Sequence, residues 1–401
     1  MRLEDFRALF TREGRWALQS AEAFAPREKD FLSEFSMLAK RFPRDLARAA
    51  LTTAILRGEA LSKFPQAEKM YFTREALEQA TPWPVAVHRA LRYQGSEQIV
   101  DLGCSIGGDA LALAASAPVI GLEQDELRAA MAQENGRALG VNLAAVQADA
   151  SALPFRLTPR QAVFFDPARR TEHGRSYSVD DYQPPLALVH DWLEQTDAVG
   201  AKISPGVQLE ELAGFDCEIE FVSLDGALKE AALWFGRFKT AARRATLLKG
   251  GKTFTLTAEE QPGLPLSEPR AYLYEPDAAV LRAGLVQTVG ADLDAAQLDP
   301  EIAYLTADTL TQTPYARVWP VLDWMPFQLK RLRAALRERN IGQVTVKKRG
   351  SPIVPEELIQ QLKLEGEGSL TLFLTQMQGA PVVIFAGEEL REGKAIRPSM
   401  P

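Results

Sequence analysis

The sequence predicts an α/β protein whose central part is a doubly wound, mainly parallel sheet. Between residues 98 and 238, short apolar segments typical of buried strands alternate with amphipathic segments at helical spacing. The first apolar segment runs into a glycine-bearing turn at residues 101–108 and then into a helical segment. Strand, tight turn and helix in that order are typical of parallel sheets, which bind their ligands at the carboxyl ends of the strands.

Composition and charge are those of an ordinary globular chain. The chain has 401 residues, enough for two or three domains, with 46% hydrophobic and 25% charged residues. No apolar stretch is long enough to span a bilayer and no signal-peptide core is present, so no membrane partner is expected. Two cysteines and three scattered histidines indicate a cytoplasmic protein without a metal. The net charge of −7 argues against a binder of nucleic acid coated in positive charge, but not against a local basic groove.

Residues 1–92 are expected to form an N-terminal helical region. Phe31, Phe35, Leu38 and Phe42 recur at helical spacing, as do apolar residues further on. This pattern indicates helices that cover the domain that follows.

The turn after the first strand is the predicted centre of a ligand site. Glycines such as Gly103 let the backbone turn sharply and leave room for a ligand against it. The loop also delivers amide N–H groups at the start of a helix, which favour anionic or electron-rich atoms. The second strand, residues 118–122, ends in Glu123, about 20 residues after Gly103, where an acid commonly binds ribose hydroxyls.

Two kinds of ligand fit this arrangement. A dinucleotide site prefers G-x-G-x-x-G, but Ser105 stands at the second glycine and Gly108 directly follows Gly107. Asp101, at the start of the turn, would repel a phosphate and suits a cation. The stretch resembles the first motif of class I S-adenosylmethionine-dependent methyltransferases, D/E-x-G-x-G-x-G, with Ser105 as the departure.

The remaining strands of this domain also end in polar residues or in a closing hairpin. They are expected at 142–147, 162–165, 198–203, 217–222 and 231–235. The third strand ends near Asp149, and in the methyltransferases that the chain resembles an Asp here accepts a hydrogen bond from the adenine amino group.

The fourth strand runs into Asp166-Pro167-Ala168-Arg169-Arg170. This segment resembles the D/N-P-P-F/Y/W tetrad of methyltransferases that act on planar nitrogens, in which the acid and the next carbonyl position the target N–H groups. An arginine in place of the aromatic residue can stack on a base or hold a phosphate. Some RNA uridine methyltransferases carry Asp-Pro-Pro-Arg, but they need a cysteine nucleophile, which neither cysteine here is placed to supply. The structural alternative is a turn acid with the two arginines as its ion pairs.

A different pattern begins near residue 241, with a hairpin turned by Gly250-Gly251. The last module is expected to contain strands at 317–322, 342–348, 370–376 and 381–385. Helices are expected at 326–339 and 355–364, after the first and second of these strands. This order resembles a ferredoxin-like α+β module.

Residues 71–238 thus resemble a class I methyltransferase with a Rossmann-like sheet, and the whole chain resembles the bacterial methyltransferases with a THUMP-like domain. The resemblance implies a transferase of the EC 2.1.1 class with S-adenosyl-L-methionine as cofactor. It implies four parts: an N-terminal helical region at 1–92, the methyltransferase domain at 93–240, a connecting β/α region at 241–315 and a ferredoxin-like (THUMP-like) domain at 316–390.

The resemblance also implies roles for individual residues. The expected cofactor-binding residues are Thr73, Asp101, Gly103, Cys104, Ser105, Gly107, Glu123, Gln124, Asp149, Ala150 and Asp166. The expected catalytic residues are Asp166, Pro167 and Arg169, and the expected substrate-binding residues are Arg170, Ser204, Lys347, Lys348 and Arg349. Thr73 follows Tyr71 and Phe72, which either fold over the methionine end of the cofactor or serve as core residues.

We therefore expect methylation of a nitrogen of an RNA base, with RNA as the partner. Basic residues between 330 and 349 can neutralise phosphates, although charge runs are equally often a solvated helix face. No aromatic RNA-recognition signature is present. The alternatives are a small-molecule or protein methyltransferase, and a catalytically inactive RNA-binding adaptor with the same fold.

Overall fold

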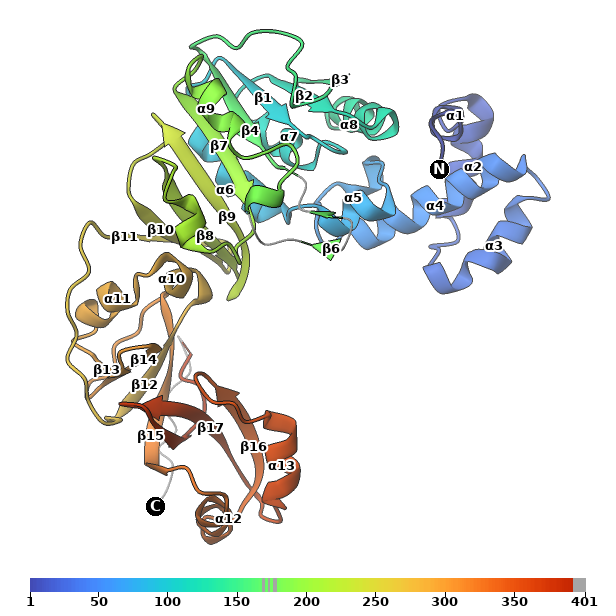
Figure 1. Cartoon of the computed structure of the whole chain (residues 1–401). Coiled ribbons are helices and arrows are strands. Elements are labelled where there is room, and N and C mark those ends of the chain that lie inside the picture. The colour runs from blue at the N-terminus through green and yellow to red at the C-terminus, as the bar shows by residue number, and fades with distance from the viewer. Residues whose placement is uncertain (168–169, 172–173, 176–178, 392–401) are drawn as a thin grey trace. The chain divides into compact units, whose positions relative to one another are not determined.

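The computed structural model describes residues 1–167, 170–171, 174–175 and 179–391 (Figure 1). The chain divides into two compact units. The first comprises Met1–Glu220 and Lys229–Thr240, and the second comprises Phe221–Leu228 and Ala241–Pro401. The chain passes between the units in β8 (Glu218–Leu224) and β9 (Ala227–Gly236), the strands predicted to form a hairpin.

The first unit begins with the predicted helices. They are α1 (Leu3–Ala8), α2 (Arg12–Glu22), α3 (Phe31–Leu38), α4 (Arg44–Ala60), α5 (Arg74–Gln79) and α6 (Trp83–Ala90). α4 is buried along most of its length because α1, α2 and α3 all pack against it. Its small alanine side chains allow the neighbouring helices to approach closely, and its leucines fill the space between them.

The sheet of the first unit has the predicted doubly wound topology. Six strands of this nine-stranded sheet, counted from β9, lie in the order β9-β7-β4-β1-β2-β3. The strands not yet given are β1 (Gln98–Leu102), β2 (Val119–Glu123), β3 (Leu143–Gln147), β4 (Gln161–Phe165) and β7 (Ala198–Ile203). β1 pairs in parallel with β2 on one side and with β4 on the other, and only β9 runs antiparallel, beside β7. The strand order therefore reverses at β1, and a crevice for ligands forms at such a point.

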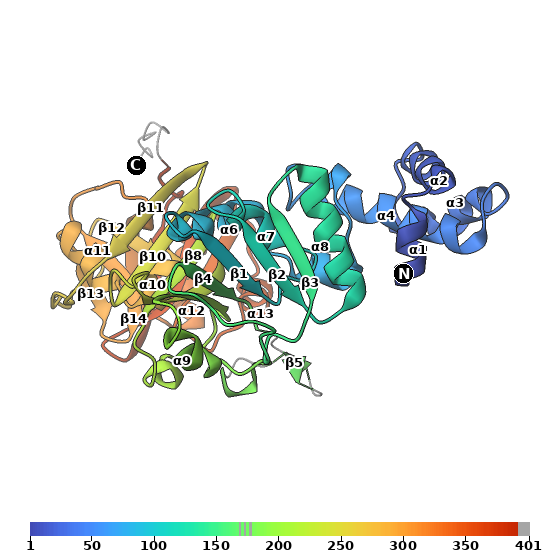
Figure 2. The same ribbon diagram turned by 90° about the horizontal axis from the view of Figure 1, so that it is seen from above.

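Helices pack along this sheet. α8 (Glu126–Leu139) packs on β2 and β3 (Figure 2), while α9 (Leu188–Leu193) packs on β7 and α7 (Gly108–Leu113) on β2 and α6. All six residues of β7, and nearly all of β1 and β4, are buried. Burial on both faces explains why these strands are continuous apolar runs in the sequence rather than alternating ones.

The second unit contains a hairpin and a separate seven-stranded sheet. The hairpin joins β10 (Arg243–Lys249) to β11 (Lys252–Thr257) through Gly250 and Gly251, which both have positive φ. The sheet has the order β13-β14-β12-β15-β18-β17-β16. Its strands are β12 (Tyr272–Pro276), β13 (Ala296–Asp299), β14 (Ile302–Ala307), β15 (Ala316–Pro326), β16 (Ile341–Lys348), β17 (Gly368–Met377) and β18 (Ala380–Ala386).

The strand and helix order predicted for the C-terminal module is confirmed. Its helices are α12 (Leu329–Glu338) and α13 (Pro355–Leu362), after α10 (Ala278–Ala283) and α11 (Val286–Asp292) of the connecting region. β15 pairs with β12 through its first half and with β18 through its second half, so one sheet runs through both parts. β16 and β17 are parallel neighbours joined by α13.

Candidate functional site

The turn after β1 and the Asp-Pro corner after β4 touch each other. β1 and β4 are parallel neighbours, with Leu102 opposite Phe165, so both strands end at the same edge. The Asp166 N–H donates to the Leu102 carbonyl at 3.3 Å. Gly103 has φ +87°, and a Cβ there would lie 3.2 Å from the Asp166 carbonyl oxygen. Glycine therefore allows the two segments to meet where a ligand of the sheet is expected.

Glu123 holds the turn in shape. Its carboxylate accepts hydrogen bonds from the Ser105 N–H at 2.9 Å and from the Asp125 N–H at 2.8 Å. Ser105 has φ +49°, the left-handed conformation in which the related motif carries glycine. The Gly103 and Cys104 N–H groups both donate to the Leu122 carbonyl, so the ends of β1 and β2 are tied together by main chain as well.

Asp101 is a fully buried acid near the end of β1. Neither carboxyl oxygen has a hydrogen-bond partner among the residues that the structure describes. Burial, together with the charges of Asp109 and Asp166, raises the pKa of Asp101 well above its ordinary value. The environment therefore favours the neutral form of this side chain. Buried polar atoms without a partner are rare in native structures, and these oxygens fit a ligand that carries donors or a positive charge.

Asp166 is one end of a connected series of ion pairs. The other members of this series were not among the predicted site residues. We call it the buried charge network: Glu230, Arg89, Asp109, Lys202 and Asp166. The Lys202 Nζ donates to Asp166 Oδ2 at 2.6 Å and lies 3.8 Å from Asp109 Oδ2. Arg89 forms an ion pair with Asp109 at 3.0 Å and donates to both oxygens of Glu230, at 3.0 and 2.8 Å.

The members of the network hold one another in their charged forms. Burial lowers the pKa of Lys202, but the carboxylates of Asp166 and Asp109 more than offset this and leave it above the ordinary value. Burial raises the pKa of Asp109, and Arg89 and Lys202 more than offset that effect, so the net shift is downward. Arg89 has a raised pKa despite its burial, because Asp109 and Glu230 flank it. Arg89, Asp109 and Lys202 therefore favour one another's charged forms.

One sequence signal could have identified this network. Lys202 is the one charged residue in an otherwise apolar strand, β7, whose six positions are all buried. Charged residues are almost never fully buried unless they are paired. A lysine in such a strand therefore predicts an acid beside it, although the sequence does not say which one.

Asn135 of α8 connects the segment before α5 to the turn after β1. The Asn135 side chain accepts from the Tyr71 N–H at 2.7 Å and donates to the carbonyls of Tyr71 at 3.0 Å and Ile106 at 2.9 Å. Tyr71 packs on Phe6 and Phe10, and Phe72 is buried against Phe64, so both aromatic residues serve the core in this structure. Thr73, which was predicted to bind the cofactor, caps α5 by accepting a hydrogen bond from the Ala76 N–H.

The predicted adenine contact lies at the open edge of the sheet. Asp149 is exposed, and its Oδ1 accepts from the N–H and hydroxyl of Ser151 at 2.8 and 2.7 Å. These hydrogen bonds lower the pKa of Asp149. Gln124 accepts a hydrogen bond from Gln147 at its carbonyl, and Ala150 is buried. The ends of β2 and β3 therefore bring Glu123 and Asp149 to the same edge.

The structure describes only some of the other residues that were predicted to act on the substrate. Pro167 is buried, while Arg169 lies outside the described residues, as does the side chain of Arg170. Ser204 is buried at the end of β7, where its N–H donates to the Tyr182 hydroxyl at 3.0 Å and its hydroxyl accepts from the Gly206 N–H at 3.2 Å.

The basic residues predicted to bind substrate in the second unit are partly engaged with an acid. Lys347 forms an ion pair with Glu275 at 2.7 Å, and Arg349 lies 4.0 Å from the same carboxylate. The Lys347 ammonium also lies 4.6 Å from the centre of the Trp319 ring. Lys348 is exposed. Only Lys348 of the three therefore presents its charge to solvent without such a contact among the described residues.

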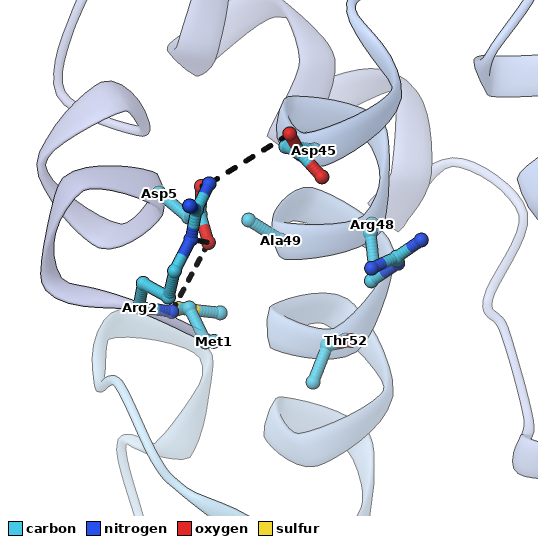
Figure 3. A pocket seen from close by; sticks show the side chains of 7 residues that line it. All are labelled: Met1, Arg2, Asp5, Asp45, Arg48, Ala49 and Thr52. Carbon is cyan, nitrogen blue, oxygen red and sulfur yellow. Dashed lines mark hydrogen bonds and ion pairs between the residues drawn. The ribbon is translucent and has the colours of Figure 1, made fainter.

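Two pockets lie elsewhere. One, of about 320 Å³, lies between α1 and α4 and is lined by Met1, Arg2, Asp5, Asp45, Arg48, Ala49 and Thr52 (Figure 3). The Arg2 guanidinium faces Asp5 at 3.1 Å and Asp45 at 3.7 Å, so these three charges in the pocket already have partners. A second pocket, of about 650 Å³, lies in the second unit beside Arg349. Neither contains the residues at the strand ends.

No metal or membrane feature is found in the described parts of the chain. No group of three or more side chains there could hold a metal ion. No helix in these parts combines the length and the apolar character needed to cross a bilayer.

Comparison with known proteins gives matches along most of the chain. Residues 99–171 match the model of a methyltransferase domain, residues 316–388 that of a THUMP domain-like family, and residues 2–60 that of a domain of unknown function. An uncharacterised S-adenosylmethionine-dependent methyltransferase of Mycobacterium tuberculosis, found in two strains, is 36% identical over 344 residues, which are 83% of this chain and 94% of the relative. The crystal structure of a putative methyltransferase from Porphyromonas gingivalis superposes with a TM-score of 0.72 at 23% identity, over 90% of this chain and 98% of that one.

Proposed function

Since the chain belongs to the S-adenosylmethionine-dependent methyltransferases, as its identity to the mycobacterial member shows, we propose that it methylates a nitrogen of an RNA base. The cofactor of the family is S-adenosylmethionine. The proposal concerns the substrate and the residues that act on it. It rests above all on the contact between the Asp166-Pro167 corner and the turn at Gly103.

The strand ends of the first unit offer the groups that this cofactor needs. We assign Asp101 to a positively charged part of the cofactor, because its buried oxygens have no other partner among the described residues. Glu123 and Asp149 suit the ribose and the adenine, because they follow one another along the edge. Gly103 leaves space that a side chain would fill. Bound S-adenosylmethionine supplies an electrophilic methyl group on a positively charged sulfur.

Asp166 is proposed to position the target nitrogen. Its Oδ2 is held by Lys202, so Oδ1 and the Pro167 carbonyl are the acceptors for N–H groups of the base. The nitrogen forms its bond to the methyl carbon as the carbon–sulfur bond breaks, the sulfur keeps the electron pair, and the nitrogen loses a proton to solvent. Because the methyl group is already activated, the residues act through orientation and through stabilisation of charge that builds on the nitrogen.

The cysteines favour nitrogen over carbon as the target. Burial raises the pKa of Cys104 well above its ordinary value, and it raises the pKa of Cys217 to about 12. Both remain thiols at neutral pH. Methylation at C5 of a pyrimidine requires a thiolate that attacks the base, and neither cysteine is prepared for that step.

RNA is proposed as the substrate because of the THUMP domain-like match and the charge of α12. Lys330, Arg331 and Arg337 are exposed on this helix, and Lys348 is exposed at the end of the neighbouring β16. Side chains of this kind neutralise phosphates without reading the base. The two free cysteines suit the reducing cytoplasm, where we place the reaction.

The test is transfer of a tritiated methyl group from labelled cofactor to total cellular RNA, protein and metabolite fractions, followed by nucleoside analysis of the labelled fraction. We expect label in a base-methylated nucleoside, and loss of most of it with Asp166→Ala. Label in the protein or metabolite fraction would support the alternative methyltransferases. Cofactor binding without any transfer would support an adaptor, and a covalent RNA adduct through a cysteine would exclude the proposed chemistry.

A further inference from the structure

Lys202 is the least expected residue of the site. It sits in the strand β7, all of whose residues are buried, and its Nζ is placed between two acids. The partners come from separate elements, Asp166 from the end of β4 and Asp109 from α7. The ammonium therefore connects the corner that faces the substrate to the helix that follows the cofactor turn.

Stability alone does not account for this arrangement. Moving a lysine and its partners out of water costs several kcal/mol per charge, and apolar residues of similar volume are often at least as stable in such places. β7 is otherwise apolar, so an aliphatic residue at position 202 would match its neighbours. The network of Glu230, Arg89, Asp109, Lys202 and Asp166 also remains one positive charge short. Such a cluster suits a site in which the carboxylate nearest the substrate, here that of Asp166, must be held in a fixed position.

We propose that Lys202 is a positioning residue of the methyl transfer, which fixes one oxygen of Asp166 so that the other oxygen can accept from the substrate N–H. This inference rests on the proposed function, because it assigns a role to Asp166. Arg89 extends the arrangement by holding Asp109, whose Oδ2 also accepts from the Thr81 hydroxyl at 3.2 Å. Lys202 does not touch the base and therefore acts only through Asp166.

The alternative of Lys202 as a general base is excluded by its charge. Flanking carboxylates keep its pKa above the ordinary value, so no neutral amine is available at neutral pH. The charged or titratable groups that act on Asp166 or on its partners come from every side. They are Asp101 of β1, Asp109 of α7, Arg89 of α6, Glu230 of β9, Tyr93 and Lys63.

The experiment compares the full-length wild type with Lys202→Met, Lys202→Gln, Asp166→Asn and the double variant Lys202→Met/Asp166→Asn. Single-turnover methylation of the RNA fraction that accepts label is measured from pH 5 to 9, and cofactor affinity is measured by calorimetry. The matched control is Arg92→Met, because Arg92 is also a largely buried cation but pairs with Glu218. Cofactor binding and melting temperature identify any variant that fails to fold.

We expect Lys202→Met to lower the single-turnover rate at saturating cofactor across this pH range while the cofactor affinity stays at the wild-type value, because the Asp166 oxygen that Lys202 holds at 2.6 Å is no longer fixed. Lys202→Gln keeps a donor for this oxygen, so it should lose less of the rate than Lys202→Met. In the Asp166→Asn background, Lys202→Met should change the rate little further, since the two residues act as one unit. Arg92→Met should leave the rate unchanged.

Two outcomes would overturn the inference and are distinct from failure of the proposed function. A Lys202→Met enzyme with the wild-type rate of methyl transfer, or a double variant whose losses simply add, would show that Lys202 does not act through Asp166. If Asp166→Asn and Asp166→Ala are themselves as active as the wild type, the proposed role of Asp166 fails first. The double variant replaces both charges of the pair, so it tests the inference even if Lys202→Met alone is unstable.

Discussion

At the scale of a single residue, Asp101 connects the stability of the free protein with the proposed binding of the cofactor. Leaving a buried polar group without a partner costs about 1–3 kcal/mol, and both oxygens of this acid are in that state among the described residues. The chain accepts this cost at the edge where its ligand is expected. A bound positive charge would favour ionised Asp101, so cofactor binding and loss of the proton should occur together.

Asp101→Asn tests this coupling. We expect the cofactor affinity to fall by about 10- to 100-fold, the usual range for a lost charged hydrogen bond of about 1.5–3 kcal/mol. Wild-type binding near pH 7 should release a proton, which calorimetry in buffers of different ionisation enthalpy detects, and the variant should release none. Equal affinity of the variant, or no proton release from the wild type, would remove Asp101 from the cofactor site.

The same substitution should stabilise the ligand-free protein. Burial first, and then Asp109 and Asp166, raise the pKa of Asp101 in the folded state. The folded chain therefore binds a proton that the unfolded chain releases above its ordinary pKa near 4, and stability is lost as pH rises above that value. Asparagine cannot ionise, so the gain in melting temperature of Asp101→Asn should be larger at pH 7.5 than at pH 5. A gain that is independent of pH would contradict this reasoning.

At the scale of elements, the strands of the first unit were predictable because burial on both faces leaves uninterrupted apolar runs. The polar residues that end these runs, such as Asp101, Glu123 and Asp166, were found for the same reason. Ser105 shows that the turn survives a departure from glycine, because serine adopts φ +49° there while Glu123 accepts its N–H. Local patterns were therefore sufficient wherever a residue's role depends on its neighbours in the chain.

The buried charge network escaped prediction because its pairs join distant parts of the chain. Arg89 and Glu230 come from α6 and β9, and Lys202 and Asp166 from neighbouring strands. Periodicity reports which face of an element is buried, but it does not report which charges meet across elements. The parallel pairing of β16 and β17 was undetermined for the same reason, since the order of elements is compatible with several pairings.

β16 allows structural and binding roles of basic residues to be separated. Lys347 is paired with Glu275 and packs on Trp319, whereas its neighbour Lys348 is exposed. We expect Lys347→Ala to cost about 1–2 kcal/mol of stability, below the range for fully buried pairs because both partners keep some solvent contact. Lys348→Ala should leave stability unchanged. Melting temperatures of the two variants check this, and equal destabilisation would contradict the assignment.

At the scale of the whole molecule, charge decides how RNA can be bound. The net charge of −7 means that the protein as a whole repels a polyanion, so RNA affinity must come from a local patch. The patch that we propose consists of the exposed cations of α12 in the second unit, Lys330, Arg331 and Arg337. The proposed cofactor residues lie in the first unit. Binding of RNA and of cofactor should therefore be separable by substitution.

Replacing Lys330, Arg331 and Arg337 together by glutamine should lower RNA affinity and flatten its dependence on salt. Each phosphate contact in single-stranded RNA contributes about 0.7 to the slope of log affinity against log salt concentration, so loss of three contacts should reduce the slope by about 2. Cofactor affinity should be unchanged. The control is Arg339→Gln, because Arg339 directly follows α12 but is paired with Asp323 and lies over Phe385. Fluorescence titrations of labelled RNA between about 50 and 300 mM salt measure these slopes, because the screening of charges increases over this range.

Two results would contradict the assignment. The wild type could bind RNA without salt dependence, or the affinity of the control variant could fall as far as that of the triple variant. In either case the patch is not the RNA contact, and a small-molecule or protein substrate becomes the better explanation for the methyltransferase site.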